Sequence, residues 1–293
     1  MFSTATKVRI ATMLYFLLHT LRRAFGGRDQ VTVRRRGLTW HLDLREGIDL
    51  TIYALTAFEP DTLRALESLV KEGATVLDVG ANVGAHTLHL ARLVGEKGRV
   101  IAFEPTDYAI SKLRANLLAN AALAPRVDVH QAFLVGKAGA TPATALASSW
   151  PVDGTRADDA LMGSRAMPLS GAVATTLDAV IAASGDPEVS LIKMDVDGHE
   201  LEVLEGAEEL LARRRPIIVM ELAPYVFHPK EKFDQMVNLL ARAHYVFQAL
   251  GANRRLPSDP GALRRLIPGE GSVNVVAFPS ERSPAAGKGL IHE

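Results

Sequence analysis

The sequence predicts an α/β protein with a largely parallel sheet, and two observations carry this prediction. From residue 75 onward, short apolar runs alternate with stretches whose apolar residues recur every three or four positions, as in amphipathic helices. Strands that alternate with helices of this length are typical of parallel βαβ units. Several of the apolar runs also end in an acidic residue or a glycine-containing turn, at the edge of the sheet where α/β proteins bind ligands.

Composition agrees with a folded globular chain. Of the 293 residues, 48% are hydrophobic and 23% are charged, and the length suits one large domain or two small ones. The 33 basic and 33 acidic residues balance, which argues against a surface that binds nucleic acid everywhere. The absence of cysteine excludes disulfides, thiolate zinc sites, iron–sulfur clusters and cysteine nucleophiles, and it fits a cytoplasmic location.

The N-terminal region differs from the rest in charge. Residues 1–45 contain nine basic and two acidic residues, and the remainder of the chain is correspondingly acidic. Residues 10–21 are apolar, too short for a membrane span of about 20 residues. No small-residue cleavage site follows them, so we expect a helix rather than a signal peptide. The helix packs on the domain, or else residues 8–25 lie peripherally on a membrane.

The remaining elements follow in chain order. Two alternating runs predict strands at 30–36 and 38–44, and a helix is expected at 60–70, with Gly73 just past its end. Further strands are predicted at 75–81, 99–105, 126–135, 189–198, 216–222, 245–250 and 272–279. Further helices are predicted at 85–95, 109–120, 200–214 and 232–244.

Residues 136–174 interrupt this alternation. They are rich in Ala, Gly, Ser and Pro and show little periodicity, so we expect a long loop, either a flap near the substrate or a variable insertion. We expect the chain to divide into an N-terminal helix with short strands (1–50), a main domain (51–280) and a flexible tail (281–293).

The first predicted βα turn spans residues 76–87. Gly80 and Gly84 permit a tight turn and close approach of a ligand to the backbone. Their spacing is neither G-x-G-x-x-G nor that of a phosphate loop. Asp78 beside the turn repels phosphate and attracts a cationic ligand.

Glu104 ends the second of these strands. A carboxylate at this place can accept hydrogen bonds from both ribose hydroxyls of a nucleoside. Its alternative role is that of an acid favoured by the dipole of the next helix. Together with Asp78 and the two glycines, the ribose role is favoured.

These motifs carry a family resemblance. LDVGANVG followed by AFEP resembles the class I S-adenosylmethionine-dependent methyltransferases, and VSLIKMDVDGHELEVLEGA with RPIIVMEL resembles their FkbM-type branch. The resemblance covers about residues 50–250. It implies that the main domain (51–280) is a class I methyltransferase domain, with a Rossmann-like, seven-stranded, mostly parallel sheet, helices on both faces and an antiparallel last strand. Asp197 stands where the family usually has Glu, and His199 where it has a small residue.

The resemblance also implies S-adenosyl-L-methionine as cofactor. The glycine loop would lie under its methionine part, Asp78 would order that loop, Glu104 would hold the ribose, and residues 130–132 would lie by the adenine. The cofactor-binding candidates are Phe58, Glu59, Asp78, Gly80, Ala81, Asn82, Gly84, Thr87, Glu104, Pro105, His130, Gln131, Ala132 and Asp195.

Acidic residues cluster at the end of the strand at 189–198. The catalytic candidates are Asp195, His199, Glu200 and Glu221. A carboxylate or histidine there can act as general base for a hydroxyl acceptor or orient it. Two carboxylates can also hold Mg²⁺, but no tight metal-ligand spacing is present and we predict no metal site. Asp195 and Glu200 can instead order the turn through backbone amides.

The resulting prediction is an O-methyltransferase that acts on a hydroxyl of a sugar, glycolipid or polyketide-like acceptor, either a small molecule or a glycan. A dinucleotide-binding oxidoreductase and a non-catalytic Rossmann-like binding protein are the alternatives. No nucleic-acid partner is expected, because the chain lacks an N-P-P-Y type motif and a platform of aromatic and basic residues for bases.

Overall fold

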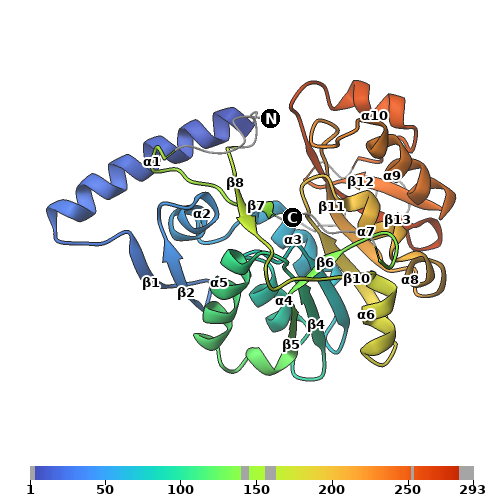
Figure 1. The fold of residues 1–293 in the computed structure, drawn as a ribbon, viewed down its shortest axis with the longest axis horizontal. Coiled ribbons are helices and arrows are strands. Elements are labelled where there is room, and N and C mark those ends of the chain that lie inside the picture. Colours follow the sequence, from blue (N-terminus) through green and yellow to red (C-terminus); the bar gives the residue numbers. More distant parts are fainter. Residues whose placement is uncertain (1–3, 140–144, 156–162, 252–253, 284–293) are drawn as a thin grey trace.

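A seven-stranded sheet forms the centre of the computed structural model, which describes residues 4–139, 145–155, 163–251 and 254–283 (Figure 1). The strand order is β12-β13-β11-β10-β3-β4-β5, and β13 runs antiparallel to both of its neighbours. The predicted mostly parallel sheet with an antiparallel last strand is confirmed. The strands are β3 (Thr75–Val79), β4 (Arg99–Phe103), β5 (Val127–His130), β10 (Val189–Met194), β11 (Ile217–Leu222), β12 (Tyr245–Ala249) and β13 (Val273–Pro279).

Helices cover both faces of this sheet (Figure 1). Neighbouring residues of a strand point to opposite faces, so Leu77 packs in a different buried cluster from Val76. Helices α3 (Pro60–Leu69), α4 (Thr87–Leu93) and α5 (Asp107–Leu118) cover one face. Helices α6 (Leu177–Ala183), α7 (Glu200–Glu205), α8 (Glu208–Arg213), α9 (Glu231–Arg242) and α10 (Pro260–Leu266) pack against the other. Burial of both faces explains why the strands are nearly continuous apolar runs.

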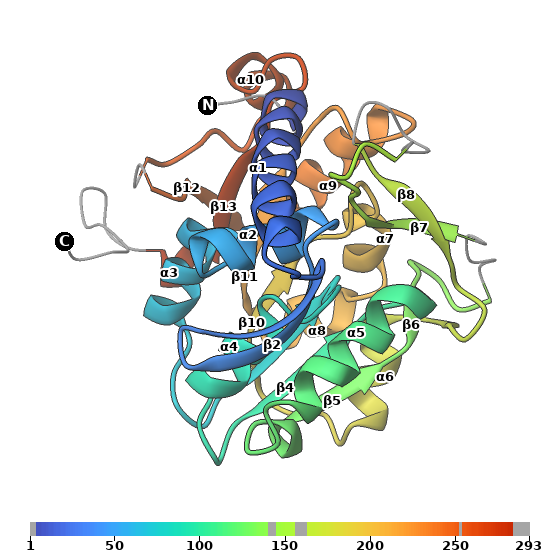
Figure 2. The ribbon, with the colours of Figure 1, turned by 90° about the vertical axis from the view of Figure 1, so that its left-hand side faces the viewer.

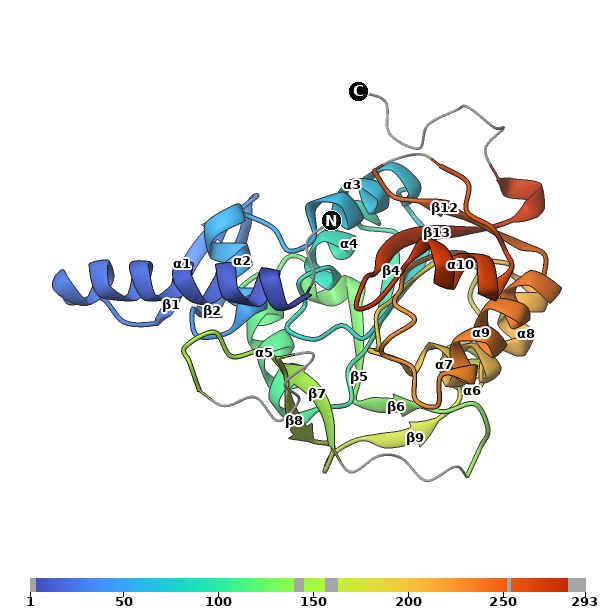
Figure 3. The same ribbon diagram turned by 90° about the horizontal axis from the view of Figure 1, so that it is seen from above.

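The N-terminal elements gather at one end of the molecule (Figure 3). They are α1 (Thr4–Ala24), the antiparallel strands β1 (Gln30–Arg35) and β2 (Leu38–Asp43), and α2 (Gly47–Leu55). Trp40 and Leu42 of β2 are buried in one cluster with Tyr15 of α1 and Leu113 of α5. Figure 2 shows α1 lying beside α2. No helix among the described residues combines the length and hydropathy of a membrane span.

Two predicted elements are wrong in extent. The strand expected at 126–135 breaks at Gln131 into β5 and β6 (Ala132–Leu134), because β6 leaves the central sheet to pair with β9 (Val173–Thr175). The helix expected at 200–214 is two helices, α7 and α8. Gly206 lies at the break, where a Cβ would come within 2.3 Å of the carbonyl oxygen of Val135.

The segment at 136–174 is predicted as a loop, but its described residues contain three short strands. Strand β7 (Ala145–Ser149) pairs antiparallel with β8 (Arg165–Pro168), and β9 follows. These strands are only three to five residues long, and half of their residues are Ala or Ser, so they lack apolar alternation. Helices α2, α6 and α10 are also absent from the prediction. Of the predicted tail, 281–283 are described and 284–293 lie outside the described residues.

Candidate active site

A cavity of about 980 Å³ lies at the carboxyl ends of the central strands. The ends of β3, β4, β10 and β11 form its floor, α1 and α2 line a second side, and the β7–β8 pair lines a third. This volume is at the upper end of the range for ligand sites, so a cofactor and an acceptor can be accommodated together. Within the segment at 136–174, the described residues 146, 150–152, 163, 164 and 166 therefore line the cavity.

Gly80 brings two strand ends into contact. Its φ is +78°, and a Cβ built on it would lie 1.8 Å from the carbonyl oxygen of Asp195. The amides of Gly80 and Ala81 both donate to the carbonyl oxygen of Phe103, at 3.0 and 2.9 Å. Only glycine permits this approach, which exposes the turn backbone to the cavity. Gly84 also has a positive φ, but its missing side chain makes room for Leu113 and does not face the cavity.

Asp78 lies behind the turn and does not line the cavity. Its carboxylate accepts a 2.6 Å hydrogen bond from the hydroxyl of Thr87 and lies 3.7 Å from the ammonium of Lys193. Lys193 in turn donates to the carbonyl oxygen of Gly80 at 3.2 Å. Asp78 and Thr87 thus order the turn from the side away from the cavity.

Glu104 forms part of the cavity wall and is buried. Its carboxylate accepts from the amide of Asn82 at 2.9 Å and from both the amide and the hydroxyl of Thr106. Oε1 accepts both bonds from Thr106 and Oε2 accepts the bond from Asn82, so the carboxylate is held in a fixed orientation and Oε2 keeps capacity for a further donor. Burial raises the pKa of Glu104, and the three hydrogen bonds oppose that rise.

The structure separates the candidates at the end of β5. Pro105 and Ala132 line the cavity, whereas His130 and Gln131 do not. The His130 ring stacks on Phe103, with ring centres 5.4 Å apart. Gln131 donates to the carboxylate of Asp107 at 2.5 Å. Both side chains therefore support the wall from outside.

Four carboxylates face the opposite part of the cavity. Glu59 precedes α3, Asp195 and Asp197 follow β10, and Glu221 lies in β11. Lys193 lies among them with its ammonium 3.7 Å from the carboxylate of Asp195. Burial lowers the pKa of Lys193, but the carboxylates of Asp195, Asp78 and Glu59 outweigh it, so the net shift is upward.

Left-handed backbone recurs among the residues that line the cavity. Glu59, Asn82 and Asp197 are non-glycine residues with φ of 42°, 48° and 49°, and all three line the cavity. Such conformations cost of order 1–3 kcal/mol each and tend to cluster at functional sites. The cavity lining is thus strained as well as charged.

Burial and the crowding of carboxylates together raise the pKa of two of them. Burial, followed by repulsion from Asp195, raises the pKa of Glu59 to about 7. The same two causes raise the pKa of Asp197 well above its usual value. A carboxylate with a pKa near neutrality exchanges protons readily at physiological pH, which is the property of a general base.

His86 also lines the cavity beside these carboxylates, and it was not predicted from the sequence as a site residue. The buried ring lies with Nε2 4.0 Å from the carboxylate of Glu59 and packs edge-on against Phe58, which also lines the cavity. Burial lowers the pKa of His86 well below its usual value, so its ring is neutral at pH 7. No sequence signal marked it beyond its place after the glycine loop.

The two remaining catalytic candidates differ in position. His199 lines the cavity, with its ring edge-on to Phe133, and burial lowers its pKa. Glu200 does not line the cavity. Its carboxylate accepts from the amide of Gly198 at 3.0 Å and from that of Val196 at 3.4 Å, so it orders its own turn. Among the described residues, no group of three or more His, Cys, Asp or Glu is arranged to hold a metal ion.

Glu200→Gln is expected to remove a pH-dependent loss of stability. Burial raises the pKa of Glu200 to about 8, from 4.5 when exposed, so folding favours its protonated form. The stability gained from that form is complete below pH 4.5 and is lost as pH rises to 8, by roughly 5 kcal/mol. Urea unfolding at pH 6 and pH 9 should show a smaller fall in the variant than in the wild type. Glu208→Gln, at an exposed position of α8, should leave the fall unchanged, and equal falls in all three proteins would contradict this explanation.

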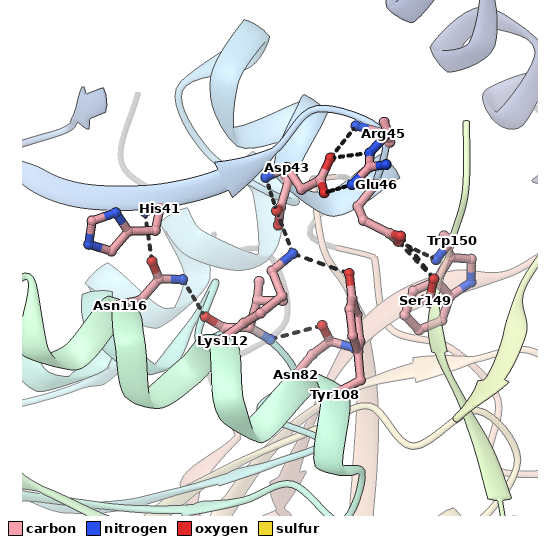
Figure 4. A network of polar contacts seen from close by, with 12 residues as sticks. His41, Asp43, Arg45, Glu46, Asn82, Tyr108, Lys112, Asn116, Ser149 and Trp150 are labelled. Atoms are coloured by element: carbon pink, nitrogen blue, oxygen red, sulfur yellow. Dashed lines mark hydrogen bonds and ion pairs between the residues drawn. The ribbon is translucent and has the colours of Figure 1, made fainter. Parts of the chain in front are cut away.

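A polar network fastens the covering elements to the sheet domain (Figure 4). Lys112 of α5 pairs with Asp49 of α2, and the carboxylate of Glu46 accepts from the hydroxyl of Ser149 and the amide of Trp150, each at 3.0 Å. Asn82 of the glycine loop donates to the carbonyl oxygen of Ser148 at 3.3 Å. The N-terminal elements, the glycine loop and residues 148–150 are therefore joined at the rim of the cavity.

Known proteins resemble this chain in sequence and in fold. Hexuronic acid methyltransferase AglP of Haloferax volcanii is 26% identical over 164 residues, which cover 55% of this chain and 61% of that protein. A methyltransferase FkbM from Methylobacillus flagellatus KT aligns with a TM-score of 0.43 and 18% identity, covering 71% of this chain and 44% of that one. An O-methyltransferase from Bacillus cereus, solved with SAH, aligns with a TM-score of 0.44 and 17% identity, covering 78% and 88% of the two chains.

Comparison with protein-family models assigns the chain to a family. The model of the methyltransferase FkbM domain matches residues 78–247, more than half of the chain. The matched range includes the glycine turn, Glu104, the end of β10 and Glu221. The chain belongs to the FkbM family of S-adenosylmethionine-dependent methyltransferases.

Proposed function

We propose that this protein transfers a methyl group from S-adenosylmethionine to a hydroxyl of a sugar-bearing acceptor, either a small molecule or a glycan. The observation that carries the proposal is the group of carboxylates facing one cavity, where Glu59 has a pKa of about 7. A hydroxyl is a weak nucleophile unless a base takes its proton, whereas a neutral amine or a thiolate attacks the methyl group without one. The similarity to a hexuronic acid methyltransferase supports a sugar as acceptor.

The residues present fit the cofactor. The turn at Gly80 keeps its backbone open for close approach, because a side chain there would collide with Asp195. Gly80, Ala81 and Asn82 would line the methionine part, and Glu104 would accept the ribose hydroxyls. Surrounding carboxylates favour a cationic sulfonium group. When bound, the cofactor supplies an electrophilic methyl group.

The chain's own residues would orient the acceptor and take its proton. Asp195 lies on the floor beside Lys193, which lets it accept a hydrogen bond from an acceptor hydroxyl. The carboxylate of Glu59 would take the proton of that hydroxyl, and the cofactor would supply the methyl group with its sulfur as leaving group. His199 and Glu221 line the same space and are proposed to contact the acceptor. In this proposal residues 51–280 carry the chemistry and residues 1–50 close the cavity.

Isothermal calorimetry with S-adenosylmethionine and its demethylated product tests the cofactor assignment. We expect both to bind, and Glu104→Gln to weaken binding about 10- to 100-fold, because it removes a charge-assisted acceptor. Glu208→Gln, on the far side of the sheet, is the matched control and should bind as the wild type does. Absence of binding at millimolar ligand, or equal affinity of the two variants, would contradict the assignment.

A further inference from the structure

The outward face of α1 is apolar and belongs partly to the cavity. Ile10, Met13, Leu17 and Leu21 recur every three or four residues and so share one side of the helix. Each is more than half exposed, and Met13 reaches 74%. Phe25, just past the helix, is 90% exposed. An exposed apolar stripe of this length marks an interaction surface.

The opposite side of α1 accounts for its attachment to the body. Tyr15 is buried, and Ala11 and Leu18 pack on the same cluster. Leu14 and Ala11 also line the cavity, as does Ile10 of the exposed stripe. On α2, Leu55 is likewise both 62% exposed and part of the cavity wall. The apolar surface is therefore continuous from the outside of α1 into the cavity.

Basic residues flank this stripe, and their charge distinguishes an anionic lipid surface from a second copy of the chain as its partner. Arg9, Arg23 and Arg28 are exposed along or just beyond α1. Asp29, the acidic residue of this stretch, bonds to His19 of α1 at 2.8 Å and lies 4.0 Å from the guanidinium of Arg23, which is itself 61% exposed. A second copy of the chain docked on this face would bring arginines together, which is unfavourable. An anionic lipid surface takes up the apolar stripe and the arginines at once.

We propose that α1 lies on an anionic membrane surface and that the acceptor is an amphiphile whose apolar chain enters the cavity between α1, α2 and the β7–β8 pair. The acceptor part of this inference rests on the proposed function. Its hydroxyl-bearing head would then reach Asp195 and Glu59 at the sheet edge, while its chain contacts residues such as Leu14 and Ile48.

Sedimentation with vesicles tests the surface and requires no methyl transfer. The full chain should pellet with vesicles of equal parts phosphatidylglycerol and phosphatidylcholine, and much less with phosphatidylcholine alone. Met13→Glu combined with Leu17→Glu should weaken binding at least about tenfold, because both side chains would enter the lipid. Leu118→Glu on α5, at a position 78% exposed, is the matched control and should bind normally. Replacing Arg9, Arg23 and Arg28 by Gln should abolish the preference for anionic vesicles.

Two results would overturn the surface assignment. One is wild-type protein that does not pellet with anionic vesicles, or pellets equally after the Met13 and Leu17 changes. The other is a dimer in analytical ultracentrifugation that the same two changes dissociate, which would assign the stripe to a second copy. Thermal unfolding of each variant, compared with wild type, shows whether an observed loss comes from misfolding.

Thermal stabilisation by alkyl glycosides tests the chain-binding part. Dodecyl glucoside below its micelle concentration should stabilise the protein, and methyl glucoside should not. Ala54→Trp, at an exposed cavity-lining position of α2, should remove that stabilisation by filling the entrance, whereas Ala182→Trp on α6 should not. Binding of an apolar chain in the cavity would be excluded if both glycosides stabilised the protein equally. It would also be excluded if dodecyl glucoside stabilised both variants equally. Because these readouts do not depend on the cofactor, their failure is distinguishable from failure of cofactor binding in calorimetry.

Discussion

Glu59→Gln is expected to lower kcat by about 10²- to 10⁴-fold, because it removes the proposed general base. Binding of S-adenosylmethionine should be retained, since glutamine keeps the size of the side chain and a hydrogen-bonding oxygen. Steady-state rates combined with calorimetry separate the two effects. A variant that keeps wild-type turnover would exclude Glu59 as the base, and one that loses cofactor binding alone would assign Glu59 to the cofactor instead.

The pH profile gives a sharper test of the same residue. The base must be deprotonated, so kcat/KM should rise with pH through about 7, the pKa of Glu59 in the folded protein. Repulsion from Asp195 is the second cause of that raised pKa, after burial. Asp195→Asn should therefore move the acidic limb to lower pH while also lowering the maximum rate, because the acceptor loses a hydrogen-bond partner. Glu208→Gln should leave the limb in place, and an unmoved limb in Asp195→Asn would show that another group controls it.

Much of the fold could be predicted because both faces of the central sheet are buried. Each strand, such as β3 or β11, then appears as an apolar run, and each covering helix as a three-to-four-residue pattern. The elements that were missed have weaker signals. Helix α2 contains only nine residues, and strands β7 to β9 are three to five residues long. Their positions depend on tertiary contacts, such as the pairing of β6 with β9, and not on local pattern.

The site divides in the same way. Gly80, Glu104 and Asp195 could be found because each ends a strand at the edge where α/β sheets bind ligands. Whether a side chain faces the cavity depends on its rotamer and its neighbours, which explains why Glu200 turns toward its own loop. The pKa of Glu59 depends on burial and on Asp195, which is distant in sequence. Burial and the distance between Glu59 and Asp195 are set by the fold, so the sequence alone does not predict this pKa.

Gly80→Ala is expected to be the most damaging small substitution at the site. The added methyl group would lie 1.8 Å from the carbonyl oxygen of Asp195, which is backbone and cannot move away as a flexible side chain would. The left-handed φ of +78° adds a conformational penalty. We expect a loss of unfolding free energy of at least about 3 kcal/mol and loss of cofactor binding, because β3 and β10 must separate where they form the floor.

Gly73→Ala isolates the steric part of this effect. Gly73 has a nearly identical φ of +83°, but no atom lies within 4 Å of the position of its missing Cβ. Gly73→Ala should lower the free energy of unfolding only by the conformational penalty of about 1–2 kcal/mol, and it should leave cofactor binding unchanged. Urea unfolding of both variants gives the difference between them. If Gly80→Ala were no more destabilising than Gly73→Ala, the contact between the turn and Asp195 would not constrain the site. A larger loss would show that one close backbone contact holds the cofactor loop and the reacting carboxylates together.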